Sequence, residues 1–270
     1  MRDQIGRPKI ALSFRHDEIV AVARAEGRVT VEDLAERFGV TPQTIRRDLT
    51  ELCADGVLSR VHGGAVLASG RSNIGYAARR HMAEDEKAAI ARLCADELPD
   101  DCSLFINIGT TTEAVARALL HHKNIMAITN NLNVANILAE NDSCEVIVAG
   151  GVLRRSDGGL VGEATGDFFQ QFKVDYAIIG ASAIDEDGTL LDFDYREVRV
   201  AQAIIENART TFLVADQTKF ARSAPVRIAS ISALDGFFTD APPPARVQTL
   251  CANEGIRLRI VDQVSTSPEA

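Results

Sequence analysis

Six apolar runs, separated by stretches with helical periodicity, occupy the chain from residue 103 to residue 261. A strand that is apolar on both faces must be covered on both faces, and strands that alternate with helices pair in parallel. The pattern therefore predicts an α/β fold with a mostly parallel sheet. The runs are SLFINI (103–108), IMAIT (125–129), EVIVAG (145–150), DYAIIGAS (175–182), TFLVAD (211–216) and IRLRIV (256–261).

The N-terminal part has a different pattern, which predicts three short helices. RHDEIVAVARAE (15–26) and VTVEDLAERFGV (29–40) each place apolar residues at helical spacing, and the second ends at Gly39. After this tight turn, TPQTIRRDLTEL (41–52) begins with Thr41, a good N-cap, followed by a proline at the first helical position. Two helices joined by so short a turn form a helix-turn-helix.

The third predicted helix has one apolar face and one polar face. Ile45, Leu49 and Leu52 fall at i, i+4 and i+7, so the residues between them point to solvent or to a partner. The following GVLSRVHGGAVL (56–67) has β-branched residues on both sides of a glycine pair, which predicts a β-hairpin. Helix-turn-helix and hairpin together indicate a winged helix.

Hydrogen-bond donors near the start of an exposed helix are what reading of the DNA major groove requires. The polar face of the third helix supplies them, and the hairpin tip adds weaker candidates for phosphate or minor-groove contacts. The alternative is that Arg46 and Arg47 are simply solvated, with Arg47 paired to Glu51 one turn on. The predicted DNA-binding residues are Thr41, Gln43, Thr44, Arg46, Arg47, Arg60 and His62.

The net charge of -9 does not argue against a DNA-binding protein, because residues 1–70 carry 10 basic and 10 acidic side chains and all the excess acid lies beyond them. The five cysteines lack C-x-x-C spacing and lie in apolar stretches, so we expect reduced core residues and no metal site. The sequence has no signal-peptide pattern and no run of the roughly 18 apolar residues that span a membrane. We therefore expect a cytoplasmic protein with no membrane partner.

The domain boundaries follow from these patterns. We predict a winged helix-turn-helix domain at 12–68, a linker and linking helix at 69–88, and an α/β domain at 89–262. The linker is expected where the composition turns to Ala, Ser, Gly and Arg, and a helical pattern then runs over 76–98.

The stretch Gly109, Thr110, Thr111, Thr112 joins a predicted strand to a predicted helix. Backbone N–H groups, three hydroxyls and the helix dipole meet at that helix N-terminus, which favours a bound phosphate. The sequence contains no G-x-x-x-x-G-K-[ST] motif, so a nucleotide P-loop is not indicated. The alternative is that threonine caps the helix without a ligand.

Other polar residues follow the carboxyl ends of predicted strands, the edge at which parallel α/β sheets bind ligands. Cationic side chains there can hold a phosphate and asparagines can bond hydroxyls, although each residue can also be an ordinary loop or cap residue. The same holds for the cluster Asp192, Asp194, Arg196 and Glu197, where acids suit a helix N-terminus. The predicted effector residues beyond the threonine loop are Asn130, Asn131, Gly150, Gly151, Arg154, Glu197 and Lys219.

These motifs resemble the DeoR family of transcriptional regulators over 15–260, close to the full length. The resemblance rests on residues 29–66, LFINIGTTTEAVARALL (104–120), TNNLN (129–133), AGGVLRRSDGGLVGEAT (149–165), DGTLLDFDYREVRVAQAIIENAR (187–209), ADQTKF (215–220) and TDAPPP (239–244). It implies that residues 30–49 bind DNA and that the C-terminal part senses a sugar phosphate or similar metabolite. The later segments look most like family members whose effector is glycerol 3-phosphate.

Sensor domains of this family are similar in fold to ribose-5-phosphate isomerase, so an isomerase with an accessory DNA-binding domain is the rival interpretation. The isomerases carry an Asp-Gly-Ala-Asp-Glu motif, whereas the comparable stretch here, IGASA (179–183), has no carboxylate. Glu197 and Lys219 remain at positions that look comparable. A site without its full acid and base set should bind and not turn over, so we expect no catalytic residue, no cofactor and no enzyme.

The sequence as a whole predicts a repressor that binds double-stranded operator DNA and is released by a small phosphorylated effector, with glycerol 3-phosphate favoured. We expect a homo-oligomer, a dimer or tetramer, because symmetric assemblies read repeated half-sites. A third possibility is a metabolite-binding adaptor without DNA contact. The sequence does not identify the operator, the regulon or the carbon skeleton of the effector.

Overall fold

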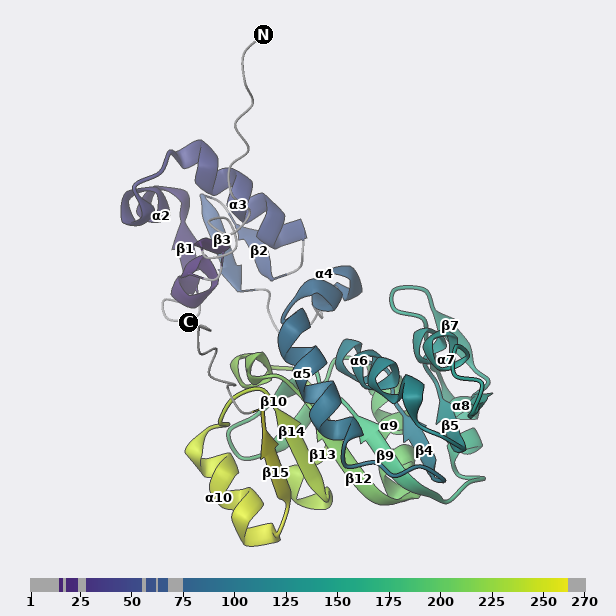
Figure 1. Cartoon of the computed structure of the whole chain (residues 1–270). Helices are drawn as coiled ribbons and strands as arrows, with labels where there is room; N and C mark the ends of the chain where they lie inside the picture. Colours follow the sequence, from purple (N-terminus) through teal and green to yellow (C-terminus); the bar gives the residue numbers. More distant parts are fainter. Residues whose placement is uncertain are drawn as a thin grey trace, which may run out of the picture. The chain divides into compact units, whose positions relative to one another are not determined.

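The computed structural model describes residues 15–16, 18–23, 28–54, 57–61, 63–67 and 75–261 (Figure 1). The chain forms two compact units, Met1–Ala78 and Arg79–Ala270. His62 and residues 69–74 of the predicted linker lie outside the described residues.

The N-terminal unit is a winged helix-turn-helix, as the sequence predicts. Residues 15–16 and 18–23 are helical and precede α2 (Val31–Phe38) and α3 (Pro42–Ala54). The sheet has the order β1 (Arg28–Thr30), β3 (Gly64–Leu67), β2 (Leu58–Val61), and both pairings are antiparallel. β1 was not predicted, and it adds a third strand to the expected hairpin.

The turn between α2 and α3 depends on Gly39, whose φ of 60° lies in the left-handed region that favours glycine. Thr30 caps α2, because its side-chain oxygen accepts a hydrogen bond from the Asp33 backbone N–H. The core beneath the turn includes Leu34, Ile45 and Leu49, all fully or almost fully buried.

The C-terminal unit is built on a seven-stranded sheet in which all neighbouring strands are parallel. The α/β class is therefore confirmed. The order across the sheet is β15 (Arg257–Ile260), β14 (Gly236–Thr239), β12 (Ala208–Val214), β9 (Val174–Ile179), β4 (Ser103–Ile106), β5 (Ile125–Thr129) and β6 (Cys144–Val148).

Helices cover both faces of this sheet, and each face has its own hydrophobic core. One core joins the strands to α5 (Glu84–Ala95), α6 (Thr110–Ala118) and α7 (Leu132–Leu138). The other joins them to α8 (Glu163–Phe169), α9 (Tyr195–Glu206) and α10 (Ala245–Glu254). Double coverage explains why the strands are apolar on both faces.

Several smaller elements were not predicted. A hairpin pairs β7 (Val152–Arg154) with β8 (Gly159–Val161), and a second sheet has the order β10 (Ala183–Ile184), β11 (Thr189–Asp192), β13 (Val226–Ser230). Three short 3₁₀ helices, η1 (Leu119–His121), η2 (Gln217–Ala221) and η3 (Ile231–Ala233), connect longer elements. Among the described residues, no helix is both long and apolar enough to cross a membrane.

The helix predicted over 76–98 is two helices, α4 (Tyr76–His81) and α5. They part at Ala83, whose φ of 52° is left-handed and incompatible with a continuous helix. Lys87 on α5 stabilises the break, because its buried ammonium donates to the backbone carbonyls of Arg79 and Met82. Arg79 lies in the last turn of α4, where helices leave carbonyl acceptors without partners, and Met82 directly follows the helix.

Candidate functional site

The first candidate site is the polar face of α3. Ile45 and Leu49 are fully buried, whereas Gln43, Arg46 and Arg47 are exposed, so the helix is oriented as its periodicity predicts. The amino end of α3 is capped by Thr41, which accepts from the Thr44 N–H at 3.3 Å, while the two hydroxyls lie 3.0 Å apart. Three of the residues predicted to meet DNA, Gln43, Arg46 and Arg47, are thus exposed on α3.

The two arginines on this face differ in their contacts. Arg47 Nε donates to Glu51 Oε1 at 3.1 Å, which is the pair anticipated as an alternative to DNA contact. The side chain of Arg46 makes no hydrogen bond or ion pair to any described residue. Arg60 on β2 donates to Thr50 Oγ1 at 3.2 Å, so a strand of the wing lies directly beside α3.

A buried ion pair behind α3 was not predicted. Arg15 contacts both carboxylate oxygens of Asp48, at 2.6 and 3.0 Å, and Asp48 is only 1% exposed. Hydrogen bonding to Asp48, opposed by partial burial, raises the pKa of Arg15. The signal was an aspartate on the apolar face of an amphipathic helix, which requires a cationic partner.

The second candidate site is a cleft at the carboxyl ends of three adjacent strands of the large sheet, β4, β9 and β12. Its volume is small, about 30 Å³, room for a few water molecules at most. Six of the residues predicted to bind the effector line this cleft: Gly109, Thr110, Thr111, Thr112, Glu197 and Lys219. The cleft is also lined by Arg79, Ile108, Gly180, Ala181, Ser182, Asp192 and Val214.

The threonine loop presents two hydroxyls to the cleft and one to its own backbone. Thr112 Oγ1 donates to the carbonyl oxygen of Asn107 at 2.7 Å and contacts that of Gly109 at 2.8 Å, which holds the start of α6. The hydroxyls of Thr110 and Thr111 have no hydrogen-bond partner among the described residues. Gly109 has a φ of 157° and a ψ of 153°, a region populated almost only by glycine.

Two basic side chains, Lys219 and Arg79, line the same cleft as these hydroxyls. Burial, and then repulsion by Arg222, lowers the pKa of Lys219 to about 7, although Asp216 opposes the shift. Arg79, on α4, lies 3.6 Å from Asp157 and is 14% exposed at its side chain. An anion at the α6 N-terminus would therefore meet backbone N–H groups, two hydroxyls without a protein partner, the Arg79 guanidinium and the Lys219 amine.

Acidic groups line another part of the cleft. Burial, and then the nearby Asp192, raises the pKa of Glu197 to about 8, against the effect of Arg154 at 2.5 Å. Ser182 Oγ donates to Asp192 Oδ2 at 2.8 Å. Carboxyl groups of this kind accept hydrogen bonds from ligand hydroxyls.

Five residues predicted to bind the effector do not line this cleft: Asn130, Asn131, Gly150, Gly151 and Arg154. Asn131 caps α7 and Asn130 Nδ2 donates to the Leu160 carbonyl, so both asparagines organise loops. The Gly150 carbonyl accepts a hydrogen bond from Thr165 Oγ1. A Cβ on Gly151 would lie 2.0 Å from Thr165 Oγ1, so the loop has no room for a side chain there.

Arg154 is placed among three carboxylates. It contacts Asp157 at 2.7 Å, Asp194 at 3.3 Å and Glu197 at 2.5 Å. Its guanidinium thus holds the acidic side of the cleft and is committed to protein partners. Asp194 is the N-cap of α9, which is the ordinary role considered for this cluster.

Arg79 and Ser182 were not singled out in the sequence. Arg79 lies before the first strand of the sheet, in a stretch whose pattern indicates only an amphipathic helix. Ser182 follows β9, in the segment 179–183, which stands out in the sequence only for its lack of carboxylates. Among the described residues, no group of three or more His, Cys, Asp or Glu side chains is placed to hold a metal ion. All five cysteines are free thiols.

Comparison with protein-family models gives two matches. Residues 15–71 match the DeoR-like helix-turn-helix domain, and residues 82–241 match the DeoR C terminal sensor domain. The first matched region contains the α3 face, and the second contains every residue that lines the cleft except Arg79.

Comparison with known proteins adds relatives of similar length. The chain is 49% identical over 246 residues to the glycerol-3-phosphate regulon repressor of Escherichia coli (strain K12), covering 91% of this chain and 98% of that one. It is 46% identical over 238 residues to the glycerol-3-phosphate regulon repressor of Haemophilus influenzae (strain ATCC 51907 / DSM 11121 / KW20 / Rd), covering 88% and 93%. A solved ribose-5-phosphate isomerase in complex with phospho-erythronic acid has a TM-score of 0.38 at 17% identity, covering 51% of this chain and 54% of that chain.

Proposed function

The chain belongs to the DeoR family of transcriptional regulators, and from that premise we propose that it binds operator DNA through α3 and is released when glycerol 3-phosphate occupies the cleft. It is a transcriptional repressor in this account, and not an enzyme. We propose the domain boundaries expected from the sequence: 12–68 for DNA binding, 69–88 for the connection and 89–262 for sensing. The repressor works in the cytoplasm as a homo-oligomer, a dimer or tetramer.

The DNA-binding assignment is supported by the exposed donors of α3. Arg46 is free to contact a base or a phosphate, and Gln43 and Thr44 lie near the amino end of the helix, where base edges are reached. Arg47 must exchange its bond to Glu51 for a DNA contact. Thr41, Arg60 and His62 complete the proposed surface.

One observation carries the effector assignment: the cleft brings the free hydroxyls of Thr110 and Thr111 together with Lys219 and Arg79 at a helix N-terminus. A phosphate fits that combination, because donors and positive charge converge on one place. Glu197 and Asp192 then face the rest of the ligand, where carboxyl groups suit hydroxyls. A polyol phosphate with few carbons has both halves of this pattern.

Two features of the cleft support a small effector and a change of structure on binding. The cleft has a volume of only about 30 Å³, and we propose that side chains move to admit a three-carbon phosphate. Arg79 is the side chain whose movement matters most, because it belongs to α4, the helix in which the N-terminal unit ends and the C-terminal unit begins. We propose that the phosphate draws Arg79 away from Asp157. A difference of about 1 to 3 kcal/mol between the two arrangements is enough for release.

Asn130, Asn131, Gly150, Gly151 and Arg154 belong to the effector region in an indirect way in this proposal. The asparagines and glycines shape loops beside the cleft, and Arg154 positions Glu197. The cleft residues that bind the ligand in this proposal are Gly109, Thr110, Thr111, Thr112, Glu197 and Lys219.

A gel-shift titration on the DNA upstream of this protein's own gene tests the proposal. The panel is glycerol 3-phosphate, dihydroxyacetone phosphate, ribose 5-phosphate, inorganic phosphate and glycerol. We expect glycerol 3-phosphate to release the DNA at the lowest concentration and glycerol to have no effect. Release by another phosphate at a lower concentration would overturn the effector assignment, and release by none would overturn the sensor assignment.

The rival function is a sugar-phosphate isomerase, and one observation favours it. Glu197 and Lys219 line the same cleft with pKa values near 8 and 7, which suits acid and base chemistry near neutral pH. An aldose-ketose phosphate isomerisation assay separates the two. Turnover above background that is lost in Glu197→Gln would establish the enzyme, whereas equal background in both proteins supports the sensor.

A further inference from the structure

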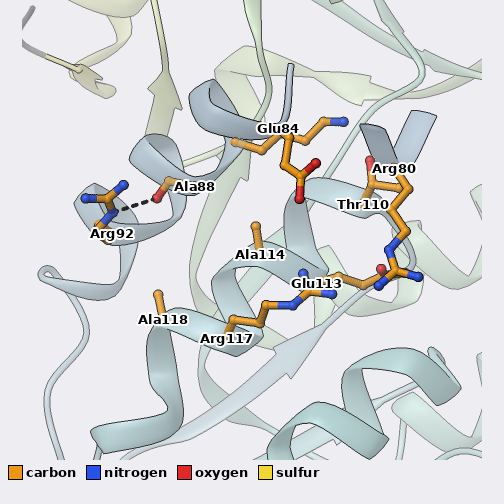
Figure 2. A pocket seen from close by; sticks show the side chains of 10 residues that line it. Arg80, Glu84, Ala88, Arg92, Thr110, Glu113, Ala114, Arg117 and Ala118 are labelled. Atoms are coloured by element: carbon orange, nitrogen blue, oxygen red, sulfur yellow. Dashed lines mark hydrogen bonds between the residues drawn. The ribbon is translucent and has the colours of Figure 1, made fainter. Parts of the chain in front are cut away.

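A second pocket of the C-terminal unit is lined by three arginines. Its volume is about 340 Å³, and it lies between α4 and α5 on one side and α6 on the other. Arg80, Arg92 and Arg117 all reach it and all are exposed. Figure 2 shows Arg92 at one end of the pocket and Arg80 at the other.

The three guanidinium groups lack protein counterions. Neither Arg80 nor Arg117 makes a hydrogen bond or ion pair within the part of the chain that the structure describes. Arg92 makes only an Nε bond to the Ala88 carbonyl of its own helix, at 3.2 Å. The unit that holds them is acidic, with the whole net charge of -9 lying beyond residue 70. Acidic neighbours are plentiful in that unit, yet these arginines are left for solvent or a ligand.

Of the two acids that line the pocket, one is buried and bonded elsewhere, and the other is exposed. Glu113 accepts from the side-chain amides of Asn131 and Asn133, at 3.4 and 3.1 Å, and is 1% exposed. Glu84 lies 3.7 Å from His81 on the neighbouring helix. Lys87 contributes its stem, because its ammonium is bonded to the carbonyls at the end of α4. The accessible charged groups of the pocket are thus three guanidinium groups and the exposed carboxylate of Glu84, so their sum is positive.

The floor of the pocket is made of small apolar side chains. Ala88 comes from α5, and Ala114 and Ala118 come from consecutive turns of α6. Figure 2 shows Ala114 between the arginine ends of the pocket. A hollow with an apolar floor and cations at both ends fits a molecule with an anionic group at each end, since guanidinium binds phosphate by paired N–H donors.

From this geometry we propose that the pocket between α4, α5 and α6 is a second ligand site, which takes a small bis-anionic metabolite such as a sugar bisphosphate. One anionic group lies against Arg92 and the other against Arg80 and Arg117. The site is separate from the effector cleft, although Thr110 lines both. Two neighbouring residues of α4 line the two sites: Arg79 lines the cleft and Arg80 lines the pocket. A ligand in the pocket therefore contacts the same helix as the effector.

Isothermal titration calorimetry on the full chain tests this site with ribulose 1,5-bisphosphate as the probe and ribulose 5-phosphate as its single-ended match. The titrations are made with wild-type protein and with two variants that impair the cleft, Lys219→Met and Thr111→Val. We expect the bisphosphate to bind all three with similar affinity, and the monophosphate to bind the two cleft variants at least tenfold more weakly than the bisphosphate does. Bisphosphate binding that disappears in both cleft variants would overturn the second site.

Arginine variants locate the site. Arg80→Ala, Arg92→Ala and Arg117→Ala should each weaken bisphosphate binding at least tenfold, whereas Arg246→Ala, an exposed arginine of α10 outside the pocket, should leave it unchanged. Circular dichroism checks that each variant is folded. Equal affinity in wild type and Arg92→Ala, or no binding of the bisphosphate to wild type, would overturn the proposal. The cleft variants test the effector site separately. If the effector assignment is wrong, the arginine variants still show whether the bisphosphate binds this pocket.

Discussion

Arg79 lies 3.6 Å from Asp157, and the two side chains are only 14% and 4% exposed. The pair joins α4, the helix in which the N-terminal unit ends and the C-terminal unit begins, to the hairpin formed by β7 and β8. Arg79 also lines the cleft that is proposed to take a phosphate. A phosphate that enters the cleft therefore competes with Asp157 for the same guanidinium.

Replacing Arg79 tests this competition. Arg79→Ala should weaken binding of glycerol 3-phosphate at least tenfold, because a charge-assisted bond is lost, while operator binding without effector persists. Titration calorimetry and a gel shift measure the two quantities. The matched control is Arg209→Ala, since Arg209 pairs with Asp175 at the same 3.6 Å but is 59% exposed and outside the cleft. Equal effector affinity in Arg79→Ala and wild type would remove Arg79 from the site.

The arginines of α3 should respond differently to substitution. Arg46→Ala should cost about 1 to 3 kcal/mol of operator binding if Arg46 makes a bidentate base contact. If it holds a phosphate, binding weakens nearly equally on all sequences and the dependence on salt becomes shallower. Gel shifts on operator and unrelated DNA at several salt concentrations distinguish these cases. Unchanged affinity in both Arg46→Ala and Arg47→Ala would favour the adaptor without DNA contact.

Glu51→Gln is the companion experiment for Arg47. The bond of 3.1 Å between Arg47 and Glu51 restrains the guanidinium and places a negative charge on the side of α3 that meets DNA. Removing the charge should strengthen operator binding, and a weaker complex would show that Glu51 orients Arg47 for its contact. The direction of the change in gel-shift affinity is the readout.

The Arg15–Asp48 pair should support the N-terminal unit. Asp48→Ala leaves the Arg15 guanidinium without its partner and removes a buried carboxylate that makes two hydrogen bonds, so we expect a loss of about 2 kcal/mol in free energy of unfolding. Denaturant titration followed by circular dichroism measures it. In the double variant Arg15→Met with Asp48→Leu, much of the loss should be recovered, because no charge is stranded. A single variant as stable as wild type would contradict the role of the pair.

Effector affinity should fall as pH rises from 7 to 9. Burial holds the pKa of Lys219 at about 7 and that of Glu197 at about 8, so a rise in pH first neutralises the lysine and then ionises the glutamate. Both changes make the cleft more negative, whereas the phosphate is already a dianion above its second pKa near 6. We expect about a tenfold loss of affinity over this range. Calorimetry at each pH measures it, and in Lys219→Met the lower part of the slope should vanish.

The helix-turn-helix was predictable because its information is local. A cap, a left-handed glycine and the spacing of Ile45, Leu49 and Leu52 specify two helices and their buried faces within a few turns of chain. The alternating strands were predictable for the same reason. β14 was missed because GFFT (236–239) is short and begins with glycine, and it becomes a strand only by pairing between β12 and β15.

The cleft was predictable only in part, since it is assembled from distant segments. The threonine loop is recognisable because it joins a predicted strand to a predicted helix. Arg79 and Ser182 line the same cleft only because the fold brings α4 and the end of β9 to it. Arg154 shows the converse, because its charge suggested a phosphate ligand while Asp157, Asp194 and Glu197 surround it. Which cations are committed to protein carboxylates is decided by tertiary contacts that periodicity does not contain.

Release of operator DNA by glycerol 3-phosphate, compared between wild type and Lys219→Met, tests the central claim most directly. We expect both proteins to bind the DNA with equal affinity and the effector to release only the wild type at concentrations where it saturates the cleft. Release of Lys219→Met at the same effector concentration as wild type would contradict it.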